Sequence, residues 1–158
     1  MTPMTSGEQR CATVRRSTGQ DLAAVTALLQ ETGLPTAGAA ESLPHFLVAE
    51  HEGHMVAVAG LELHGSSAML RSVAVHPAWR GSGLARQLID RLLAEAQARG
   101  MRDIYLLTTT AEHYFPRFGF ACIAREDVPG SVQDSIEFRE ACPASALVMR
   151  KTLVATEG

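Results

Sequence analysis

One stretch of the chain constrains its fold more than any other: an apolar run passes through a glycine-rich turn into an amphipathic helix. The run ends at Val73-Ala74-Val75, the turn carries Gly81 and Gly83, and the helix follows from Leu84. Glycine has no Cβ, so the turn can curl around an anion with its amides pointing inward, while the helix adds its first N–H groups and the positive end of its dipole. The stretch therefore predicts a strand, a pyrophosphate-binding loop and a helix in succession.

Two well-known phosphate loops do not fit these residues. A nucleoside-triphosphate loop needs a Lys-Ser/Thr pair after its last glycine, where Leu84-Ala85 stands, and a dinucleotide fingerprint needs glycine at the position of Arg86. The pattern that fits is Arg/Gln-x-x-Gly-x-Gly/Ala over residues 80–85. Through it the chain resembles the GNAT superfamily of N-acetyltransferases, and the resemblance implies acetyl-CoA as the cosubstrate.

The resemblance also implies which residues hold that cosubstrate. The strand before the loop would lend backbone groups to the pantetheine arm and the acetyl carbonyl, and the loop amides would bind the pyrophosphate. Arg80 would add charge, although a purely structural surface arginine is an alternative. The expected cofactor-binding residues are Val73, Ala74, Val75, Arg80, Gly81, Ser82, Gly83, Leu84, Ala85 and Thr108.

Size and composition limit the number of domains, the kinds of partner and the location that we expect for this protein. The chain has 158 residues, 46% of them hydrophobic, so we expect a leader over residues 1–10 and one domain over residues 11–158. A net charge of −3 with scattered basic residues argues against nucleic acid as a partner. The three cysteines form no C-x-x-C pair, so no metal site is expected. Without a signal-type or long apolar segment, we predict a cytoplasmic protein with no membrane contact; a homodimer stays open.

Hydrophobic periodicity predicts alternating strands and helices. Strands are expected over residues 12–16, 45–51, 55–64, 68–75, 104–109, 120–124 and 145–153, and helices after residue 21, over 83–99 and, briefly, over 111–118. Glu52-Gly53 is a plausible hairpin turn, and Glu95 can pair with Arg99. This order resembles the GNAT arrangement over residues 12–153. The predicted fold class is α/β (α+β), with a central, mostly antiparallel mixed sheet of six to seven strands flanked by helices.

A second segment, residues 108–120, resembles the family pattern Asn-x-x-Ala-x-x-x-Tyr-x-x-x-Gly-Phe. Thr108 stands where asparagine is frequent, and Phe115 stands where many members carry the tyrosine that protonates the departing thiolate. Tyr114 comes one residue early, which turns it about 100° around a helix. It is a candidate general acid if Pro116 distorts the segment, and a packing residue otherwise.

Closer resemblances bear on the substrate. Residues 106–109 and 113–115 look like the Leu-Thr-Thr…His-Trp-Phe stretch of N-acetylglutamate synthases, although the chain is too short for their amino-acid-kinase domain. Residues 106–112 and 142–145 look like segments of small acetyltransferases encoded with arsenic-resistance genes. The second resemblance implies a role in resistance to organoarsenical amino acids. The first implies N-acetylglutamate synthesis for arginine production.

Arg71 is the main residue-level pointer to an acidic substrate. Many GNAT members place an acidic base at this position, and a permanent guanidinium can instead clamp a carboxylate, phosphinate or arsinate; a structural salt bridge is an equal alternative. The base would then be Glu62 or His64, expected as exposed alternating residues of the neighbouring strand, or a water relay. The remaining substrate-binding candidates are His113 and, by similarity to the synthases, Arg139 and Ser145.

Together these observations predict direct acetyl transfer to the amine of a small acidic amino acid. The oxyanion that develops on the thioester carbonyl would be met by a backbone amide near Val73. A rival of another class is an acyl-CoA-binding sensor without turnover, which the missing tyrosine favours.

Overall fold

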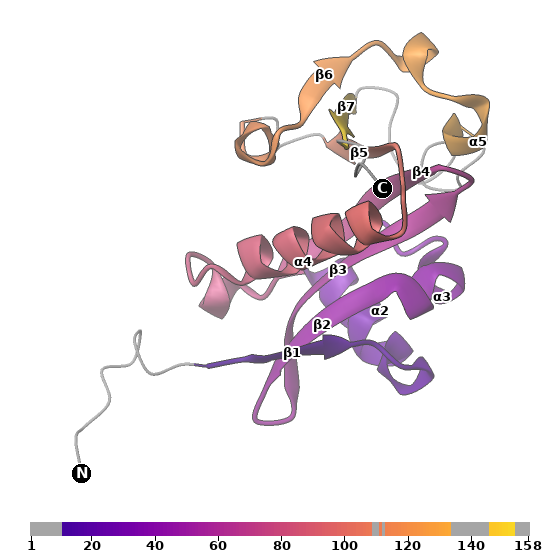
Figure 1. The fold of residues 1–158 in the computed structure, drawn as a ribbon. Coiled ribbons are helices and arrows are strands. Elements are labelled where there is room, and N and C mark those ends of the chain that lie inside the picture. Colours follow the sequence, from indigo (N-terminus) through magenta and orange to yellow (C-terminus); the bar gives the residue numbers. More distant parts are fainter. Residues whose placement is uncertain (1–10, 109–110, 112, 134–145, 154–158) are drawn as a thin grey trace.

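The computed structural model describes residues 11–108, 111, 113–133 and 146–153 (Figure 1). These residues form one seven-stranded sheet in the order β1-β2-β3-β4-β5-β7-β6. Every neighbouring pair is antiparallel except β4 and β5, so the predicted mixed, mostly antiparallel sheet is confirmed. The strands are β1 (Thr13–Arg16), β2 (Phe46–His51), β3 (His54–His64), β4 (Ser67–Val75), β5 (Asp103–Thr108), β6 (Ala121–Ile123) and β7 (Leu147–Thr152).

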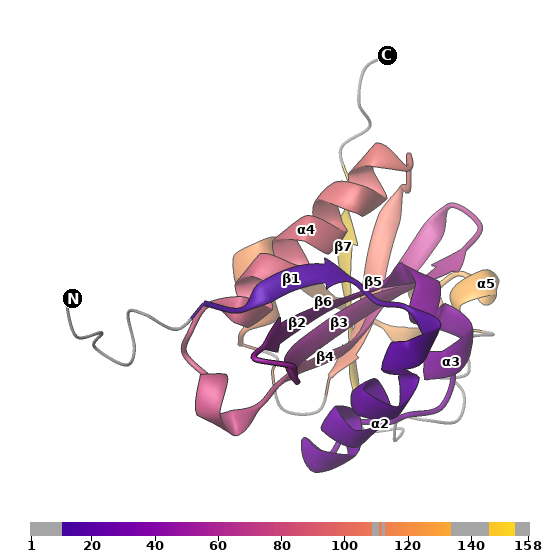
Figure 2. The ribbon, with the colours of Figure 1, turned by 90° about the horizontal axis from the view of Figure 1, so that it is seen from below.

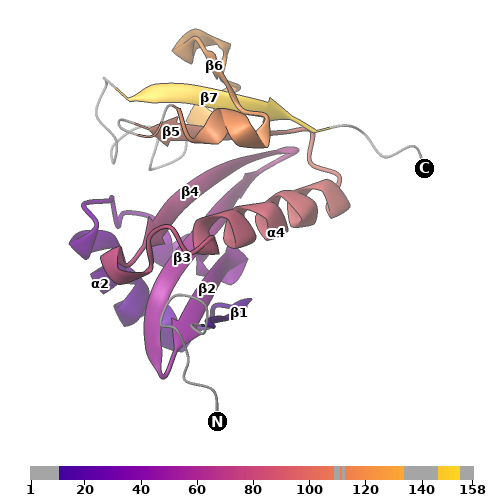
Figure 3. The ribbon, with the colours of Figure 1, turned by 90° about the vertical axis from the view of Figure 1, so that its left-hand side faces the viewer.

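Helices cover both faces of this sheet (Figures 2 and 3). On one face α4 (Leu84–Ala98) buries Leu84, Leu88, Ile89, Leu92 and Ala96. On the other face lie α2 (Leu22–Glu31), α3 (Ala39–Ser42) and, near β4 and β7, α5 (Gly130–Gln133). Short 3-10 turns complete the chain: η1 (Gly19–Asp21), η2 (Leu43–His45), η3 (Pro77–Trp79), η4 (Phe115–Phe118) and η5 (Arg125–Asp127). Apolar side chains at helical spacing explain the burial of α2 and α4.

Most predicted elements agree with the structure within one or two residues, and the differences have local causes. The α3 helix was not predicted, because its four residues are too few for a periodic signal. The expected short helix over 111–118 is the 3-10 turn η4, since Pro116 removes a backbone donor and Gly119, at φ 97°, ends the turn. The expected Glu95–Arg99 pair is replaced by an ion pair between Glu95 and Arg16 of β1. The predicted leader over 1–10 lies outside the described residues.

The β2–β3 hairpin closes as predicted at Glu52-Gly53. Both residues have positive φ, 52° and 80°, which is the backbone conformation of a type I′ turn. This turn matches the twist of the two long strands and sets their register.

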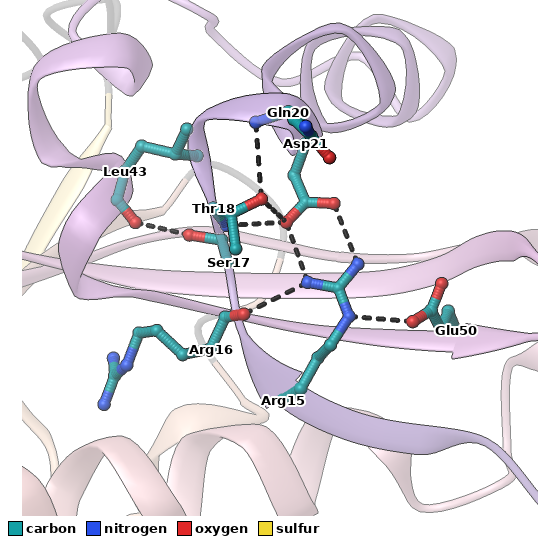
Figure 4. Close-up of polar contacts among 8 residues, drawn as sticks. All are labelled: Arg15, Arg16, Ser17, Thr18, Gln20, Asp21, Leu43 and Glu50. Carbon is teal, nitrogen blue, oxygen red and sulfur yellow. Dashed lines mark hydrogen bonds and ion pairs between the residues drawn. The ribbon is translucent and has the colours of Figure 1, made fainter.

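An arginine network fastens β1 to its neighbours (Figure 4). Arg15 Nε donates to Glu50 Oε1 of β2 at 2.7 Å, while its Nη1 and Nη2 donate to Asp21 at 2.8 and 2.9 Å. Asp21 also accepts from the backbone N–H of Thr18 at 2.7 Å, forming the capping box that starts η1. The hydrogen bonds from Arg15 lower the pKa of Asp21 from 3.8 to about 2. We call Arg15, Asp21 and Glu50 the Arg15 network.

A β-bulge in β4 positions the functional site. Val58 faces Ala74 and Gly60 faces Arg71, so Ala59 of β3 opposes two residues of β4, Ser72 and Val73. Ser72 has φ 60°, a left-handed conformation that is uncommon outside glycine. β4 pairs with β5 only from Ser67 to Met69, after which the two strands diverge (Figure 3). The divergence leaves the second half of β4 open on the β5 side.

Candidate active site

A cleft of about 1080 Å³ lies where β4 and β5 diverge. Its lining includes the second half of β4, residues 79–81 and 83–86 of the loop and the start of α4, residues 106–108 at the end of β5, and Tyr114, Phe115 and Arg117. The loop between α2 and α3 closes one end with Thr32, Gly33, Leu34 and Pro35. The divergence of β4 and β5 therefore leaves an opening of the size that holds an extended ligand.

The glycine-rich loop takes the shape that the sequence predicts for anion binding. Gly81 and Gly83 have φ 81° and 88°, and a Cβ at either position would meet no atom within 4 Å. Glycine is thus required by backbone conformation, and the space above the loop is open. The ladder of α4 begins with the Gln87 N–H donating to the Gly83 carbonyl at 3.0 Å, so the preceding amides belong to the helix N-terminus.

Most predicted donor-site residues line the cleft. They are Val73, Ala74, Val75, Arg80, Gly81, Gly83, Leu84, Ala85 and Thr108. Ser82 does not line it, and its amide donates to the Trp79 carbonyl at 3.2 Å, which shapes the loop from within. Thr108 Oγ1 accepts from the Ala111 N–H at 2.9 Å, so its hydroxyl also closes the turn after β5.

Arg71 enters the same cleft from a buried cluster. Its Nη1 donates to Glu62 Oε2 at 2.5 Å, and its Nε donates to Ser72 Oγ at 2.9 Å. Glu62 Oε1 lies 2.9 Å from His64 Nε2. We call Glu62, His64, Arg71 and Ser72 the Arg71 cluster. The structure thus brings together the predicted site residues Glu62, His64 and Arg71. It also shows the structural salt bridge predicted as the alternative role of Arg71.

Two members of this cluster differ from the exposed positions that strand alternation predicts. Glu62 is 6% exposed and His64 is half-buried, because both lie on the face that α5 and the neighbouring strands cover. Neither is among the described residues that line the cleft, whereas Arg71, itself 2% exposed, is. A base must come within about 2.6–3.2 Å of the proton it removes, or act through one water.

Tyr114 lies on the cleft wall within an aromatic group. Its ring contacts Phe115 and Phe118 with centroids 5.3 and 5.4 Å away. The Arg117 guanidinium lies 4.5 Å from the ring centroid, and its Nε donates to the Tyr114 carbonyl at 3.0 Å. Burial raises the pKa of the Tyr114 hydroxyl, although Arg117 and Arg86 oppose this. The hydroxyl is therefore protonated at neutral pH.

The remaining predicted residues are not gathered into the cleft. His113 is exposed and is not one of the described lining residues. Arg139 and Ser145 lie outside the described residues. Conversely, sequence reasoning missed Arg86 and Arg117, two cations on the cleft wall, and the loop at residues 32–35. Arg86 could have been predicted, because it lies in the first helical turn after the glycines. No feature of residues 32–35 indicates that they line a site.

The described part of the chain lacks two other kinds of feature. It contains no group of three or more His, Cys, Asp or Glu side chains placed to hold a metal ion. Nor does it contain a helix long and apolar enough to cross a membrane.

Comparison with known proteins agrees with this geometry. A family model described as an acetyltransferase (GNAT) domain matches residues 42–122. An amino-acid acetyltransferase from Edwardsiella ictaluri is 30% identical over 139 residues, which cover 82% of this chain and 31% of the relative. One from Aeromonas salmonicida is 30% identical over 73% of this chain and 28% of its own length. The chain thus spans about a third of the length of these relatives.

Solved structures with the same fold were found as well. Rv2747 from Mycobacterium tuberculosis, in complex with CoA and NLQ, superimposes with a TM-score of 0.75 at 26% identity, covering 90% of this chain and 99% of that one. N-acetylglutamate synthase from Neisseria gonorrhoeae, complexed with coenzyme A and N-acetyl-glutamate, gives a TM-score of 0.77 at 17% identity, covering 92% and 36%. The family model spans β2 to β6 and includes the whole glycine-rich loop. The chain therefore belongs to the GNAT acetyltransferase family.

Proposed function

We propose that the chain acetylates the amino group of a small acidic amino acid, or of a phosphinate or arsinate analogue of one. The observation that carries the proposal is Arg71, a buried cation that reaches the cleft beside the bulge of β4. Arginine is suited to a planar or tetrahedral oxyanion and cannot serve as a base at neutral pH. The relatives named amino-acid acetyltransferase support an amino acid as the substrate.

The donor half of the cleft fits acetyl-CoA. The open space above Gly81 and Gly83 and the N-terminus of the fifteen-residue α4 suit a pyrophosphate. Arg80, Arg86 and Arg117, which also line the cleft, add positive charge for the phosphates. The open edge of β4 at residues 73–75 would pair with the pantetheine arm. When bound, the thioester supplies an activated acetyl group.

The acceptor half would place the amine against that acetyl group. Arg71 would hold the acidic group of the substrate, and a backbone amide near Val73 would stabilise the negative charge that develops on the carbonyl oxygen. Tyr114 would give its proton to the leaving thiolate. Since Glu62 and His64 stand behind Arg71, the substrate ammonium would lose its proton through water.

Release of CoA thiol, measured with a panel of amines, tests the proposal. The panel is L-glutamate, L-aspartate, phosphinothricin, arsinothricin, L-glutamine and a short neutral peptide. We expect kcat/KM to be at least about tenfold higher for an acidic member than for glutamine, because glutamine leaves the Arg71 charge unmatched. A preference for glutamine or for the peptide would contradict the proposal.

The same panel separates the finer alternatives. A preference for arsinothricin or phosphinothricin over glutamate would support a detoxifying role in arsenic resistance, and the reverse would support N-acetylglutamate synthesis. The acyl-CoA-binding sensor predicts acetyl-CoA binding with no CoA release for any amine. Steady turnover with one acidic amine excludes it.

A further inference from the structure

The guanidinium of Arg71, which lines the cleft, is held from two sides: by Glu62, which is not among the described lining residues, and by Ser72, which is. Glu62, on β3, accepts from Nη1 at 2.5 Å, and Ser72, the bulged residue of β4, accepts from Nε at 2.9 Å. The two bonds meet different corners of a planar group. Together they fix both its position and its plane.

Glu62 is itself held. Its second oxygen, Oε1, lies 2.9 Å from His64 Nε2, and the carboxylate is 7% exposed. Glu62 pairs with Met69 across the sheet, which makes Arg71 its diagonal neighbour on the same face. The chain of contacts therefore runs from His64 through Glu62 to Arg71 and ends at the cleft.

We propose that Glu62 is a positioning residue for Arg71, assisted by Ser72, and that it acts in this way instead of as the base. This inference rests on the proposed function. When a long side chain becomes ordered only as the ligand binds, the lost conformational entropy weakens binding of that ligand. A side chain that is already held in place avoids this cost. Glu62 thus sets the affinity for the acidic group without touching the substrate.

Glu62→Gln tests the inference, since it keeps the shape of the side chain and removes its charge. We expect the KM for L-glutamate to rise about tenfold, the size of one charge-assisted hydrogen bond. The KM for acetyl-CoA should stay within about twofold, and kcat within about threefold, whereas loss of a base lowers kcat by about 100-fold or more. A large fall in kcat at unchanged glutamate KM would overturn the inference.

Glu50→Gln is the matched control. Glu50 also accepts from an arginine, Arg15, at 2.7 Å, but it lies on β2 and does not line the cleft. Its substitution should leave both KM values unchanged. In an Arg71→Gln background, Glu62→Gln should add no further rise in glutamate KM, because its partner is already absent. An equal rise in that background would overturn the inference.

A second variant covers the case in which Glu62→Gln does not fold. Ser72→Gly removes the hydroxyl that accepts from Arg71 Nε and relieves the positive φ of residue 72. It should raise glutamate KM about threefold. Unchanged KM in a folded Ser72→Gly variant contradicts the inference.

The NMR signal of Arg71 Nε–Hε separates failure of this inference from failure of the proposed function. It should be sharp and slow to exchange in the wild-type protein and broadened in Ser72→Gly and Glu62→Gln, whichever amine the enzyme uses. An unchanged signal overturns positioning. A wild-type enzyme that accepts no acidic amine overturns the proposed function alone.

Discussion

The two halves of the cleft, which we propose to hold the acetyl donor and the acceptor amine, differ in the residues that form and support their surfaces. On the donor side, Gly81, Gly83 and the start of α4 line the cleft, and Arg80 and Arg86 add positive charge. On the acceptor side, Arg71 lines the cleft and is held by the buried Glu62 behind it. Backbone geometry is specified by local glycine and helix signals, whereas a side-chain cluster depends on strand pairing. The halves should therefore respond to substitution separately, and four variants test this.

The largest effect is expected on the donor side. Gly83→Asp places a carboxylate at a residue with φ 88°, facing the open space for the pyrophosphate. Like charges in that space should weaken acetyl-CoA binding by more than about 100-fold. Isothermal titration calorimetry with acetyl-CoA measures this.

Gly65→Asp is the control for the loop. Gly65 has φ 65° with no atom within 4 Å of its Cβ position, so the backbone strain is similar, but it lies in the β3–β4 turn away from the cleft. Its acetyl-CoA affinity should equal that of the wild type. Unchanged affinity in a folded Gly83→Asp variant would show that the loop does not bind the donor.

Tyr114→Phe tests the tyrosine on the cleft wall. If the Tyr114 hydroxyl protonates the leaving thiolate, kcat should fall about 100-fold with both KM values nearly constant. The burial that raises the pKa of Tyr114 keeps the proton available at neutral pH. Steady-state kinetics with saturating acetyl-CoA give the result.

Tyr105→Phe is the matched variant, because Tyr105 is also buried but donates to Asp103 at 3.1 Å and does not line the cleft. It should leave kcat unchanged. A near-wild-type rate for Tyr114→Phe would make that tyrosine a packing residue of the aromatic group.

On the acceptor side, Arg71→Gln should raise KM for acidic amino acids about 10- to 100-fold, the equivalent of losing about 1.5–3 kcal/mol. Acetyl-CoA affinity should stay near normal. The variant should also lower the free energy of unfolding, because the buried Glu62 loses its partner. Kinetics with each substrate varied in turn separate these effects.

Loss of stability without a rise in substrate KM would contradict the acceptor role. Arg71 would then be an ion-pair residue of the sheet, and the acidic-substrate proposal would lose its main support.

The smallest effect is expected outside the cleft. Arg15→Gln breaks the Arg15 network, which has the same chemistry as the Arg71 cluster but lies partly exposed at the sheet edge. It should lower the free energy of unfolding at pH 7 by about 1 kcal/mol, because solvent screens such pairs, and should change no kinetic constant. A change in substrate KM would contradict the view that the Arg15 network affects only stability while the Arg71 cluster affects substrate binding.

The pH dependence of this variant has a defined sign. Folding lowers the pKa of Asp21 from 3.8 to about 2, so the stabilisation is present above pH 3.8 and is lost as pH falls toward 2. The difference in unfolding free energy between wild type and Arg15→Gln should shrink over that range. Urea unfolding at pH 7, 4 and 2.5 measures it; a constant difference would rule out Asp21 as the partner that matters.

Local signals in the sequence determined much of this protein. The hydrophobic stripe of α4, the Glu52-Gly53 turn and the positive-φ glycines at 81 and 83 each depend on residues close together in the chain. For that reason the sheet class, the long helix and the glycine-rich loop between β4 and that helix could be predicted from residues alone. The resemblance to GNAT enzymes rested on the same loop and is confirmed by the family match.

Only the tertiary structure decided the acceptor half. Glu62 and Arg71 are nine residues apart, and their ion pair depends on the β3–β4 register, in which Glu62 pairs with Met69. No pattern in the sequence shows that α5 covers this face of the sheet, so alternation predicted Glu62 to be exposed where it is buried. The edge of β4 opens because β5 pairs with only its first three residues. Sequence specifies local conformation, but strand pairing decides which distant side chains share a buried face.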